Sequence, residues 1–429
     1  MLLSADIDLV RRDPIITGLE TLLDADAFAT ALDTALPTVS VRAAQATYVR
    51  YKPGTNCLVA YKVKTDRGSV PVYARAYSAE LGVKLGHVRR VYDQPSVLDV
   101  GGLCLDKLDT SVYVWPYDYK LRNLAHLSNP EQRTVVIDQL TSHVPELSGS
   151  ILTDLRYRPE RRYVGRLDGA TRSGLFKLYR KEDYEHVRSA ATAFYSTELL
   201  NIVPLLGESS CYHALLFHWQ AGCPLNDSLW NTTWEPAVFR DTGKALALLH
   251  GQDAATLPTL IDQNPRDALA AAVQSIVVLC PNLERQVQDL AKHITTSLAQ
   301  SPEIRPIHGD FYADQVLLNG NQITILDLDN ATWGEPAFDL ATFAAHLWRM
   351  VVQGNGTAAR AVQIIEALFA GYDQQGVLPS RTQIALHTAA GLLRLAPEPF
   401  RYRRENWLQR VHALVLAAEE ILTHEHIRT

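Results

Sequence analysis

Cysteine and methionine are scarce in this chain, which has five cysteines and two methionines among 429 residues. The cysteines are odd in number, lie far apart and form no C-x-x-C pair. They are typical of reduced core residues rather than of disulfides or zinc ligands. Such cysteine usage predicts a cytoplasmic protein. The residues concerned are Cys57, Cys104, Cys211, Cys223 and Cys280.

Long apolar runs are also absent from the sequence. The best candidate for a membrane span, residues 268–280, is too short and includes Gln274 and Ser275. Residues 1–14 carry acidic side chains early and have no apolar core of the kind found in a secretory signal. We therefore expect neither a membrane partner nor a signal peptide.

An excess of positive charge is lacking too, since the formal net charge is -6. This argues against nucleic-acid binding, which needs a basic face. Basic residues do cluster in 156–166 and 399–407, where they could form solvated faces or meet a phosphate. With 47% hydrophobic and 21% charged residues, the chain has an ordinary globular composition and the length for two or three domains. Its oligomeric state is left open.

Two segments of the chain carry the same β pattern. Residues 45–80 contain three β-rich runs separated by turns, and residues 153–180 repeat the arrangement. Tyr51 and Tyr157, each followed by a basic residue and proline, are 106 residues apart, and Trp115 and Trp219 are 104 apart. The nearly constant offset indicates a duplicated β unit. The alternative is that two unrelated β-meanders look alike.

Beyond about residue 230 the pattern becomes helical. Apolar residues recur at spacings of three and four, and the first such segment closes on Gly251. A short β segment at 314–329 interrupts the series. A β-rich part followed by a helix-rich part predicts an α+β fold. The predicted helices cover residues 235–251, 282–300, 357–376 and 407–426.

Several aspartates stand beside apolar runs in residues 307–341. Carboxylates are costly to bury unless a cation, a basic side chain or water meets them. A phosphoryl-transfer site needs a carboxylate for the attacking hydroxyl, oxygen ligands for Mg²⁺ and a lysine for the nucleotide phosphates. Asp310 lies in a loop, Gln315 offers an amide oxygen, and Asp327 ends an apolar strand, so the three would meet at one cleft.

The spacing of these residues resembles the motifs of the aminoglycoside/choline phosphotransferase-like kinases. The resemblance implies a bilobal protein-kinase-like fold, with a β-rich N-lobe and a helical C-lobe. Gln315 stands where most members have asparagine, and maltokinase-like and glucosamine-kinase-like members share this glutamine. The matching residues are His308, Gly309, Asp310, Asp327, Gly334, Pro336 and Asp339-Leu340-Ala341.

This resemblance also implies the roles of individual residues. Asp310 would be catalytic, Gln315 and Asp327 would bind Mg²⁺, and Lys177 would bind the phosphates of ATP. His308 and Asp339 would shape the loop, while Asp329 would either support the site or lie on the surface. Adenine would bond to the backbone of Phe217, His218, Trp219 and Gln220.

Two structural details of that resemblance stay open in the sequence. The glutamate that pairs with the family's lysine could be Glu185 or Glu198. The position equivalent to Lys177 in the first β unit is Ala74 or Arg75. Trp333 and residues 396–407 could line the acceptor pocket.

The expected domains are an N-terminal cap module at 1–145, an N-lobe and hinge at 146–222, and a C-lobe at 223–429. The duplicated β unit would make the cap module a degenerate N-lobe duplicate. The function we expect is an ATP- and Mg²⁺-dependent small-molecule kinase that phosphorylates a hydroxyl of a sugar or amino sugar. The alternatives are a catalytically weak nucleotide-binding regulator and an antibiotic phosphotransferase. The basic residues of the C-terminal part count against the polycationic acceptors of the last class.

Overall fold

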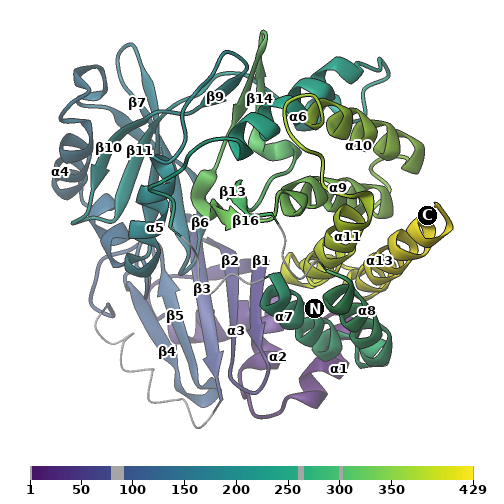
Figure 1. Cartoon of the computed structure of the whole chain (residues 1–429). Coiled ribbons are helices and arrows are strands. Elements are labelled where there is room, and N and C mark those ends of the chain that lie inside the picture. The colour runs from purple at the N-terminus through teal and green to yellow at the C-terminus, as the bar shows by residue number, and fades with distance from the viewer. Residues whose placement is uncertain (1, 79–90, 259–264, 299–302, 429) are drawn as a thin grey trace. The chain divides into compact units, whose positions relative to one another are not determined.

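The structure is a computed structural model, described for residues 2–78, 91–258, 265–298 and 303–428 (Figure 1). The chain divides into two compact units. Unit 1 comprises Met1–Glu182, Ser209–Leu215 and Glu398–Leu408, and unit 2 comprises Asp183–Glu208, Leu216–Pro397 and Gln409–Thr429. Both units are discontinuous in the sequence.

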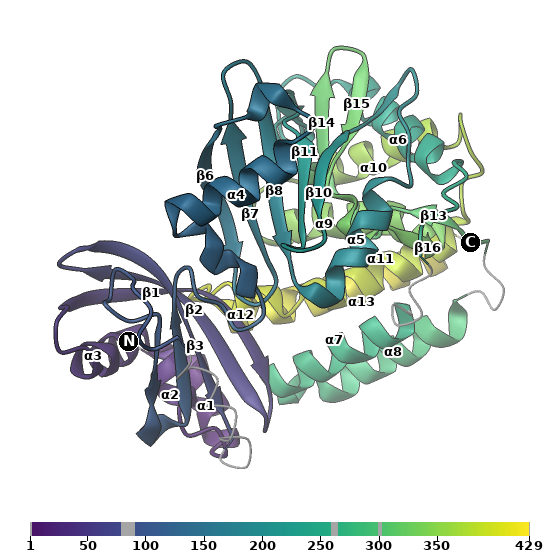
Figure 2. The same ribbon diagram turned by 90° about the vertical axis from the view of Figure 1, so that its left-hand side faces the viewer.

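Unit 1 opens with three helices and a five-stranded antiparallel sheet in the order β1-β2-β3-β5-β4. Helix α2 packs on β2 and β3, and α3 packs on β1, so these helices cover one face of the sheet (Figure 2). Asp24 caps α3 by accepting the N–H groups of Asp26 and Ala27. The elements are α1 (Ser4–Arg12), α2 (Leu19–Leu23), α3 (Ala25–Ala35), β1 (Val41–Lys52), β2 (Asn56–Thr65), β3 (Gly68–Tyr77), β4 (Gly102–Leu105) and β5 (Thr110–Val114).

A second five-stranded sheet follows, in the order β10-β11-β8-β7-β6. The two sheets have the same strand order. If the strands of each sheet are counted in chain order, the third strand pairs with the fifth, and the fifth pairs with the fourth. A helix precedes the first strand in both cases. The elements are α4 (Pro130–Thr141), β6 (Ile151–Arg158), β7 (Arg162–Asp168), β8 (Ser173–Tyr179), β10 (Leu205–Ser209) and β11 (Ala214–His218).

The helices of unit 2 surround a small sheet of order β12-β14-β15-β9 and a two-stranded ladder of β13 and β16. Helix α6 packs along α10, and α9 along α11 (Figure 1). The strands are β9 (Leu200–Ile202), β12 (Cys223–Pro224), β13 (Arg305–Ile307), β14 (Val316–Asn319), β15 (Gln322–Ile325) and β16 (Thr332–Gly334). The helices are α5 (Lys181–Ala191), α6 (Pro236–His250), α7 (Pro265–Leu279), α8 (Glu284–Ser297), α9 (Pro336–Val352), α10 (Ala358–Tyr372), α11 (Arg381–Leu395) and α13 (Trp407–Arg428).

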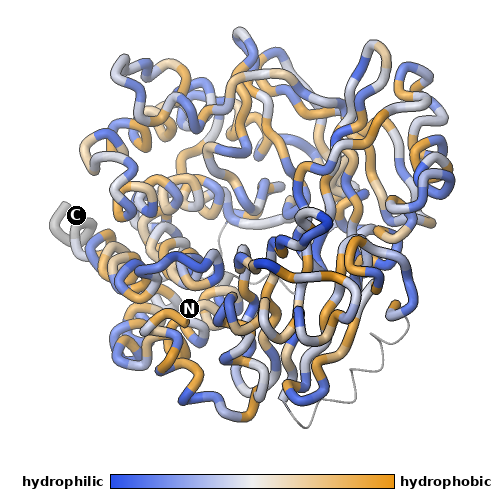
Figure 3. The backbone as a smooth tube through the Cα atoms, turned by 180° about the vertical axis from the view of Figure 1, so that it is seen from behind, coloured by the Kyte–Doolittle hydropathy of each residue, from blue (hydrophilic) through white to orange (hydrophobic). Residues whose placement is uncertain are grey.

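One apolar core of unit 2 joins α6, α9 and α10 to strands of the small sheet. Phe239 and Leu246 of α6, Phe343 of α9 and Leu368 of α10 are at most 1% exposed. Hydropathy changes from residue to residue along the helices and strands (Figure 3). Among the described residues, no helix is both long and apolar enough to cross a membrane.

The α+β prediction is confirmed, and the four predicted helices correspond to α6, α8, α10 and α13. Helices α1 to α5, α7, α9 and α11 lie outside the four predicted ranges. The basic cluster at 399–407 is also more than a solvated face. Arg403 forms an ion pair with Asp6, which is fully buried, and Trp407 donates from Nε1 to Asp6 at 3.1 Å. Residues 398–401 form the short helix α12 (Glu398–Arg401).

Candidate active site

The loop that follows β13 is held by one buried carboxylate. Asp339, on the first turn of α9, accepts the backbone N–H of His308 at 2.6 Å and that of Gly309 at 2.9 Å. It also bonds to Nε2 of His250 at 3.0 Å, and Asp339 is fully buried. The prediction that Asp339 is a buried acceptor for loop amides is confirmed. Charge-assisted bonds of this kind hold a loop more firmly than neutral ones.

His308 fixes the same loop from its side chain. Its Nε2 lies 2.7 Å from the carbonyl oxygen of Leu326, and its Nδ1 lies 3.2 Å from the backbone nitrogen of Asp310. Because Nδ1 accepts the N–H of Asp310, Nε2 carries the proton that is donated to Leu326. This agrees with the structural role expected for His308.

Gly309 meets a requirement that no other residue type satisfies well. Its φ is +79°, and a Cβ built there would lie 2.2 Å from the carbonyl oxygen of Asn330. The left-handed conformation alone disfavours a side chain, and the close approach to backbone excludes one. The loop therefore packs directly on the segment that follows Asp327.

The β14–β15 hairpin brings the backbones of Gln315 and Asp327 close together. Gln315 immediately precedes β14, and Asp327 comes two residues after the end of β15. The N–H of Leu326 donates to the carbonyl oxygen of Gln315 at 2.8 Å, so the two positions are adjacent at one end of the hairpin. Asp327 has a left-handed backbone, with φ +58°. Through Leu326, the same end is bonded to His308.

Asp310 lines a cavity of about 180 Å³ within unit 2. The cavity lies among the loop, α9 and α11. Neither Gln315 nor Asp327 lines it, so the cavity is distinct from the place where these two residues meet. Trp333 and residues 396–407 do not line it either. Its lining residues are Gly309, Asp310, Thr342, Ala345, His346, Gly391, Arg394 and Leu395.

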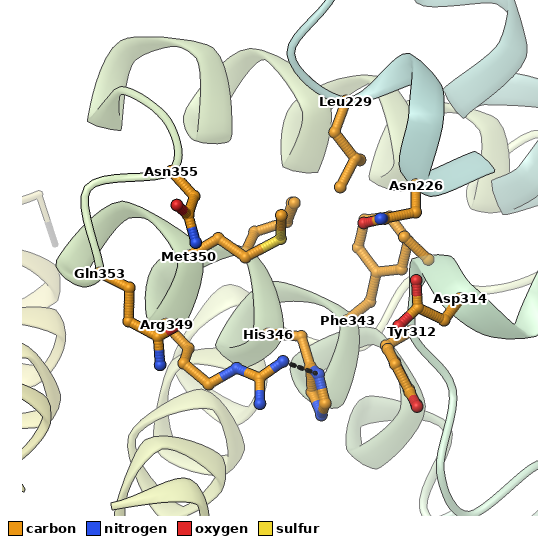
Figure 4. A pocket seen from close by; sticks show the side chains of 12 residues that line it. Asn226, Leu229, Tyr312, Asp314, Phe343, His346, Arg349, Met350, Gln353 and Asn355 are labelled. Carbon is orange, nitrogen blue, oxygen red and sulfur yellow. Dashed lines mark hydrogen bonds between the residues drawn. The ribbon is translucent and has the colours of Figure 1, made fainter. Parts of the chain in front are cut away.

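A second cavity of about 160 Å³ shares His346 with the first (Figure 4). Arg349 donates from Nη2 towards Nδ1 of His346 at 3.4 Å, and the His346 ring stacks on Tyr312 with centroids 4.1 Å apart. Burial holds the pKa of His346 well below its usual value, and the positive charges of Arg349 and Arg394 act in the same direction. The imidazole is therefore neutral at neutral pH.

Lys177 lies on β8, which is the middle strand of its sheet, and pairs with Val164 on β7. It is 5% exposed. Lys177 is therefore neither on an edge strand nor solvated. Of the two glutamates considered as its partner, Glu185 forms an exposed ion pair with Arg188 at 3.1 Å, and Glu198 is exposed.

The expected hinge begins at the end of β11. Phe217, His218, Trp219 and Gln220 are all partly exposed. The N–H of His218 is already bonded to the carbonyl oxygen of Pro204 at 2.9 Å. The Gln220 side chain accepts from Asn201 at 3.4 Å and donates to the carbonyl oxygen of Ala221 at 3.1 Å. The amide of His218 is thus committed within the protein, whereas the segment as a whole stays accessible.

Sequence reasoning did not find every residue near Asp310. Thr342, His346 and Arg394 line its cavity, but each lies more than 30 residues from Asp310 in the sequence. In the sequence, Arg394 is one of the basic residues of the C-terminal part and lies outside the cluster at 399–407. Its position directly after the apolar run 389–393 of α11 is the one signal that could have singled it out. Asp329 is partly buried in η8 (Leu328–Asn330), where its charge faces His186.

The antiparallel β-sheets and the helical C-terminal part match the class of small-molecule phosphotransferases with a protein-kinase-like fold. The chain belongs to the APH phosphotransferase enzyme family, whose model matches residues 160–377. It is therefore an ATP-binding kinase that acts on hydroxyl groups. The match begins just before β7 and leaves the first sheet outside. No curated protein matches the chain.

Solved structures share the fold at low identity. A choline kinase from Cryptosporidium parvum Iowa II is 10% identical, with a TM-score of 0.50, over 70% of this chain and 97% of its own. A choline/ethanolamine kinase family protein from Mesorhizobium loti is 14% identical, with a TM-score of 0.43, over 68% and 94%. A macrolide 2′-phosphotransferase from Brachybacterium faecium is 18% identical, with a TM-score of 0.45, over 66% and 97%. At these identities the likeness concerns the fold alone.

Proposed function

We propose that this protein is an ATP- and Mg²⁺-dependent kinase that transfers the γ-phosphoryl group to a hydroxyl of a sugar or amino sugar. The observation that carries the proposal is the convergence of the loop and the hairpin. Hydrogen bonds through His308 and Leu326 bring Asp310 close to the end of the hairpin where Gln315 and Asp327 meet. This is the minimum set of oxygens that phosphoryl transfer requires.

Asp310 is the group that accepts or orients the proton of the attacking hydroxyl. It is positioned by the Nδ1 of His308 and lines a cavity large enough for a small acceptor. Because the transition state is loose and anionic, catalysis consists mainly of positioning and charge neutralisation. A carboxylate at the place of Asp310 serves to position the attacking hydroxyl.

Gln315 and Asp327 are the proposed ligands for Mg²⁺. Among the described residues, no three His, Cys, Asp or Glu side chains gather in a way that could hold a metal ion. One carboxylate and one amide oxygen nevertheless fit a magnesium ion that is bound largely through nucleotide phosphates and water. The bound ion would neutralise charge on those phosphates. In support, Gln315 is 9% exposed and is held against the hairpin by its backbone.

Lys177 and the hinge are the proposed nucleotide contacts. Lys177 is buried on a central strand, where its long side chain could place a fixed charge on the phosphates. Phe217, Trp219 and Gln220 would offer backbone groups to adenine. His218 would take part through its carbonyl oxygen, because its N–H is bonded to Pro204.

The glutamine at position 315 supports a sugar or amino sugar as the acceptor, since it is the feature shared with maltokinase-like and glucosamine-kinase-like members. The alternative of an antibiotic phosphotransferase is less favoured. Each cavity near the loop is smaller than the roughly 300–1,000 Å³ of pockets that hold drug-sized ligands. The alternative of a catalytically weak regulator rests on the glutamine and on the unidentified partner of Lys177.

An acceptor panel tests this function. ADP formation is measured with ATP and a set of sugars, amino sugars and amino alcohols, with and without Mg²⁺. We expect Mg²⁺-dependent ADP formation with at least one sugar. Asp327→Asn should raise the Mg²⁺ concentration for half-maximal activity by about tenfold or more, since it removes a charged ligand. Without Mg²⁺-dependent turnover on any acceptor, the regulator would be the better description.

For the domain organisation we propose a cap module at 1–145, an N-lobe and hinge at 146–222 and a C-lobe at 223–429. The cap would be a degenerate copy of the N-lobe, which the common strand order supports. An offset of 106 maps Leu58 onto Val164, and their partners across the ladder are Arg75 and Lys177. Arg75 thus replaces the lysine, and it forms an ion pair with the buried Glu160.

Matched variants test the loss of nucleotide binding in the cap. Lys177→Met should weaken ATP binding at least about tenfold, because it removes one charge–phosphate contact. Arg75→Met, measured at a temperature where the variant is folded, should leave ATP affinity unchanged. Equal weakening by both variants would contradict the degenerate copy. We further propose a cytoplasmic location, which the free cysteines support.

A further inference from the structure

The cavity beside Asp310 contains a cation that the proposed chemistry does not use. Arg394 lies in the last turn of α11, and its guanidinium stacks over the Phe338 ring, 4.4 Å from the ring centroid. Gly391, one turn earlier, allows α11 to approach α9 closely: a Cβ built there would lie 2.8 Å from the Cβ of Ala345. Two packed helices therefore hold the arginine at the cavity.

Among the described residues, none takes up the hydrogen-bonding capacity of this arginine. A guanidinium has five N–H donors, and that of Arg394 belongs to a side chain that is only partly exposed. In the part of the chain that the structure describes, Arg394 forms no side-chain hydrogen bond and no ion pair. Its contact with Phe338 uses the face of the guanidinium and leaves the donors at its edge for a ligand.

Arg394 is cationic under working conditions. Burial lowers its pKa to about 10, while the carboxylates of Asp310 and Asp339 act in the opposite direction. His346, which lines the same cavity, is neutral, and Arg349 lies just beyond it in the second cavity. Apart from the carboxylate of Asp310, the fixed charges nearest to an acceptor in this cavity are therefore those of Arg394 and Arg349.

We propose that the acceptor bears, in addition to its reactive hydroxyl, an anionic group that Arg394 binds. This rests on the proposed function and narrows its acceptor class from sugars and amino sugars in general to hydroxylated acids. An arginine fork matches the oxygens of a carboxylate or phosphate better than those of scattered hydroxyls. A cationic amino sugar would instead be repelled by Arg394.

The position of the cavity assigns this anion to the acceptor rather than to the nucleotide. Gln315 and Asp327, the proposed metal ligands, do not line it. Asp310 lines it, so a molecule bound there would have its hydroxyl within reach of the catalytic carboxylate. Arg394 is accordingly a specificity residue: it selects the acceptor and takes no part in the proton transfer.

The first test is binding without turnover, measured by calorimetry on the full chain in the presence of ADP and Mg²⁺. The probes are D-glucose, D-glucosamine, D-glucuronate and D-glucose 6-phosphate, which separate neutral, cationic, carboxylate and phosphate forms of one ring. We expect one anionic probe to bind at least about tenfold more tightly than D-glucose, the worth of one ion pair. Equal or weaker binding of both anions overturns the inference.

Matched arginine variants identify the residue responsible. Arg394→Met keeps an apolar side chain against Phe338 and should remove the preference for the anionic probe over D-glucose. Arg404→Met removes the same charge from an exposed position in unit 1. It should change neither the preference for the anionic probe nor the affinity for D-glucose. A preference that survives Arg394→Met, or one that is also lost in Arg404→Met, would refute the assignment.

Turnover of the same four probes separates this inference from the proposed function. Anion binding that depends on Arg394, without transfer to any acceptor, would leave the inference standing and remove the kinase activity. Phosphoryl transfer to D-glucose or D-glucosamine with no advantage for the anionic probes would support the kinase activity and refute the inference about Arg394. We expect the anionic probe that binds best to have the highest kcat/KM, and Arg394→Met to lower it about tenfold or more.

Discussion

Asp118 holds the turn after β6 by the same pair of hydrogen bonds through which Asp13 holds the turn after β1. Oδ2 of Asp13 accepts from the Tyr51 hydroxyl at 2.6 Å and from the N–H of Gly54 at 2.8 Å. Oδ2 of Asp118 accepts from the Tyr157 hydroxyl at 2.7 Å and from the N–H of Glu160 at 2.8 Å. Sequence similarity alone suggested a repeat, and this shared geometry strengthens the proposal of a duplicated lobe.

Removing either hydroxyl should therefore have the same effect. Tyr51→Phe and Tyr157→Phe each delete one bond to a buried carboxylate, and we expect each to lower the free energy of unfolding by about 1–2 kcal/mol. Urea titration followed by circular dichroism measures this. Tyr195→Phe, at a side chain that is 59% exposed, is the control. If the two variants matched that control, the aspartates would not be holding the turns.

Asp310→Asn should bind nucleotide as the wild type does and lose nearly all turnover. The amide preserves the size of the side chain but cannot accept the hydroxyl proton, and general-base groups typically contribute 100-fold or more. Calorimetry with ATP and an ADP-release assay give the two readouts. Full activity in this variant would remove Asp310 from the mechanism.

Two glycines with positive φ provide a matched pair at the active site. Gly309→Ala should lower kcat at least about tenfold and destabilise the chain by roughly 1–3 kcal/mol, because the new methyl group meets the carbonyl oxygen of Asn330. Gly320→Ala, at the tip of the β14–β15 hairpin with φ +59°, has nothing within 4 Å of its Cβ. It should retain kcat. Near-ultraviolet circular dichroism verifies folding, and a fully active Gly309→Ala variant would be incompatible with the observed packing.

His346 should make stability fall on the acidic side of neutrality. Its pKa in the folded chain lies well below the usual value because of burial, with Arg349 and Arg394 contributing. At pH values below about 6.5 the unfolded chain binds a proton that the folded chain does not, so unfolding is favoured there by up to roughly 1.4 kcal/mol per pH unit. Above that pH the effect vanishes.

Thermal unfolding between pH 7 and pH 5 tests this sign. His346→Gln should lose less Tm on acidification than the wild type does. The comparison is with His143→Gln, which removes an imidazole from an exposed position. The buried environment of His186 also lowers its pKa, so part of the acid loss should remain in the His346 variant. An unchanged pH dependence would mean that His346 is protonated in the folded chain.

Local features of the sequence predicted much of this site. The HGD loop and the hairpin are continuous in the chain, so the spacing of Asp310, Gln315 and Asp327 already places them near one another. The helices were found because their apolar residues recur at helical spacing. The roles of His308 and Asp339 followed from a family pattern, and the hydrogen bonds of the loop agree with them.

Tertiary relationships could not be predicted in the same way. Phe338 and Arg394 are 56 residues apart in the sequence, and only the packing of α9 on α11 brings them together. Asp13 and Asp118 likewise bond to turns that no local pattern connects with them. The helices α1 to α3 are short, and their apolar residues became interpretable only once the sheet that they cover was known.

The ion pair between Arg403 and Asp6 joins residues that are 397 positions apart. Protein engineers who wish to isolate the family region cannot cut the chain at a linker, because the segment Glu398–Leu408 returns to unit 1. A fragment starting at residue 146 would leave a buried guanidinium and the indole of Trp407 without their acceptor. Activity assays on trimmed versions would then report misfolding rather than the absence of a dispensable cap.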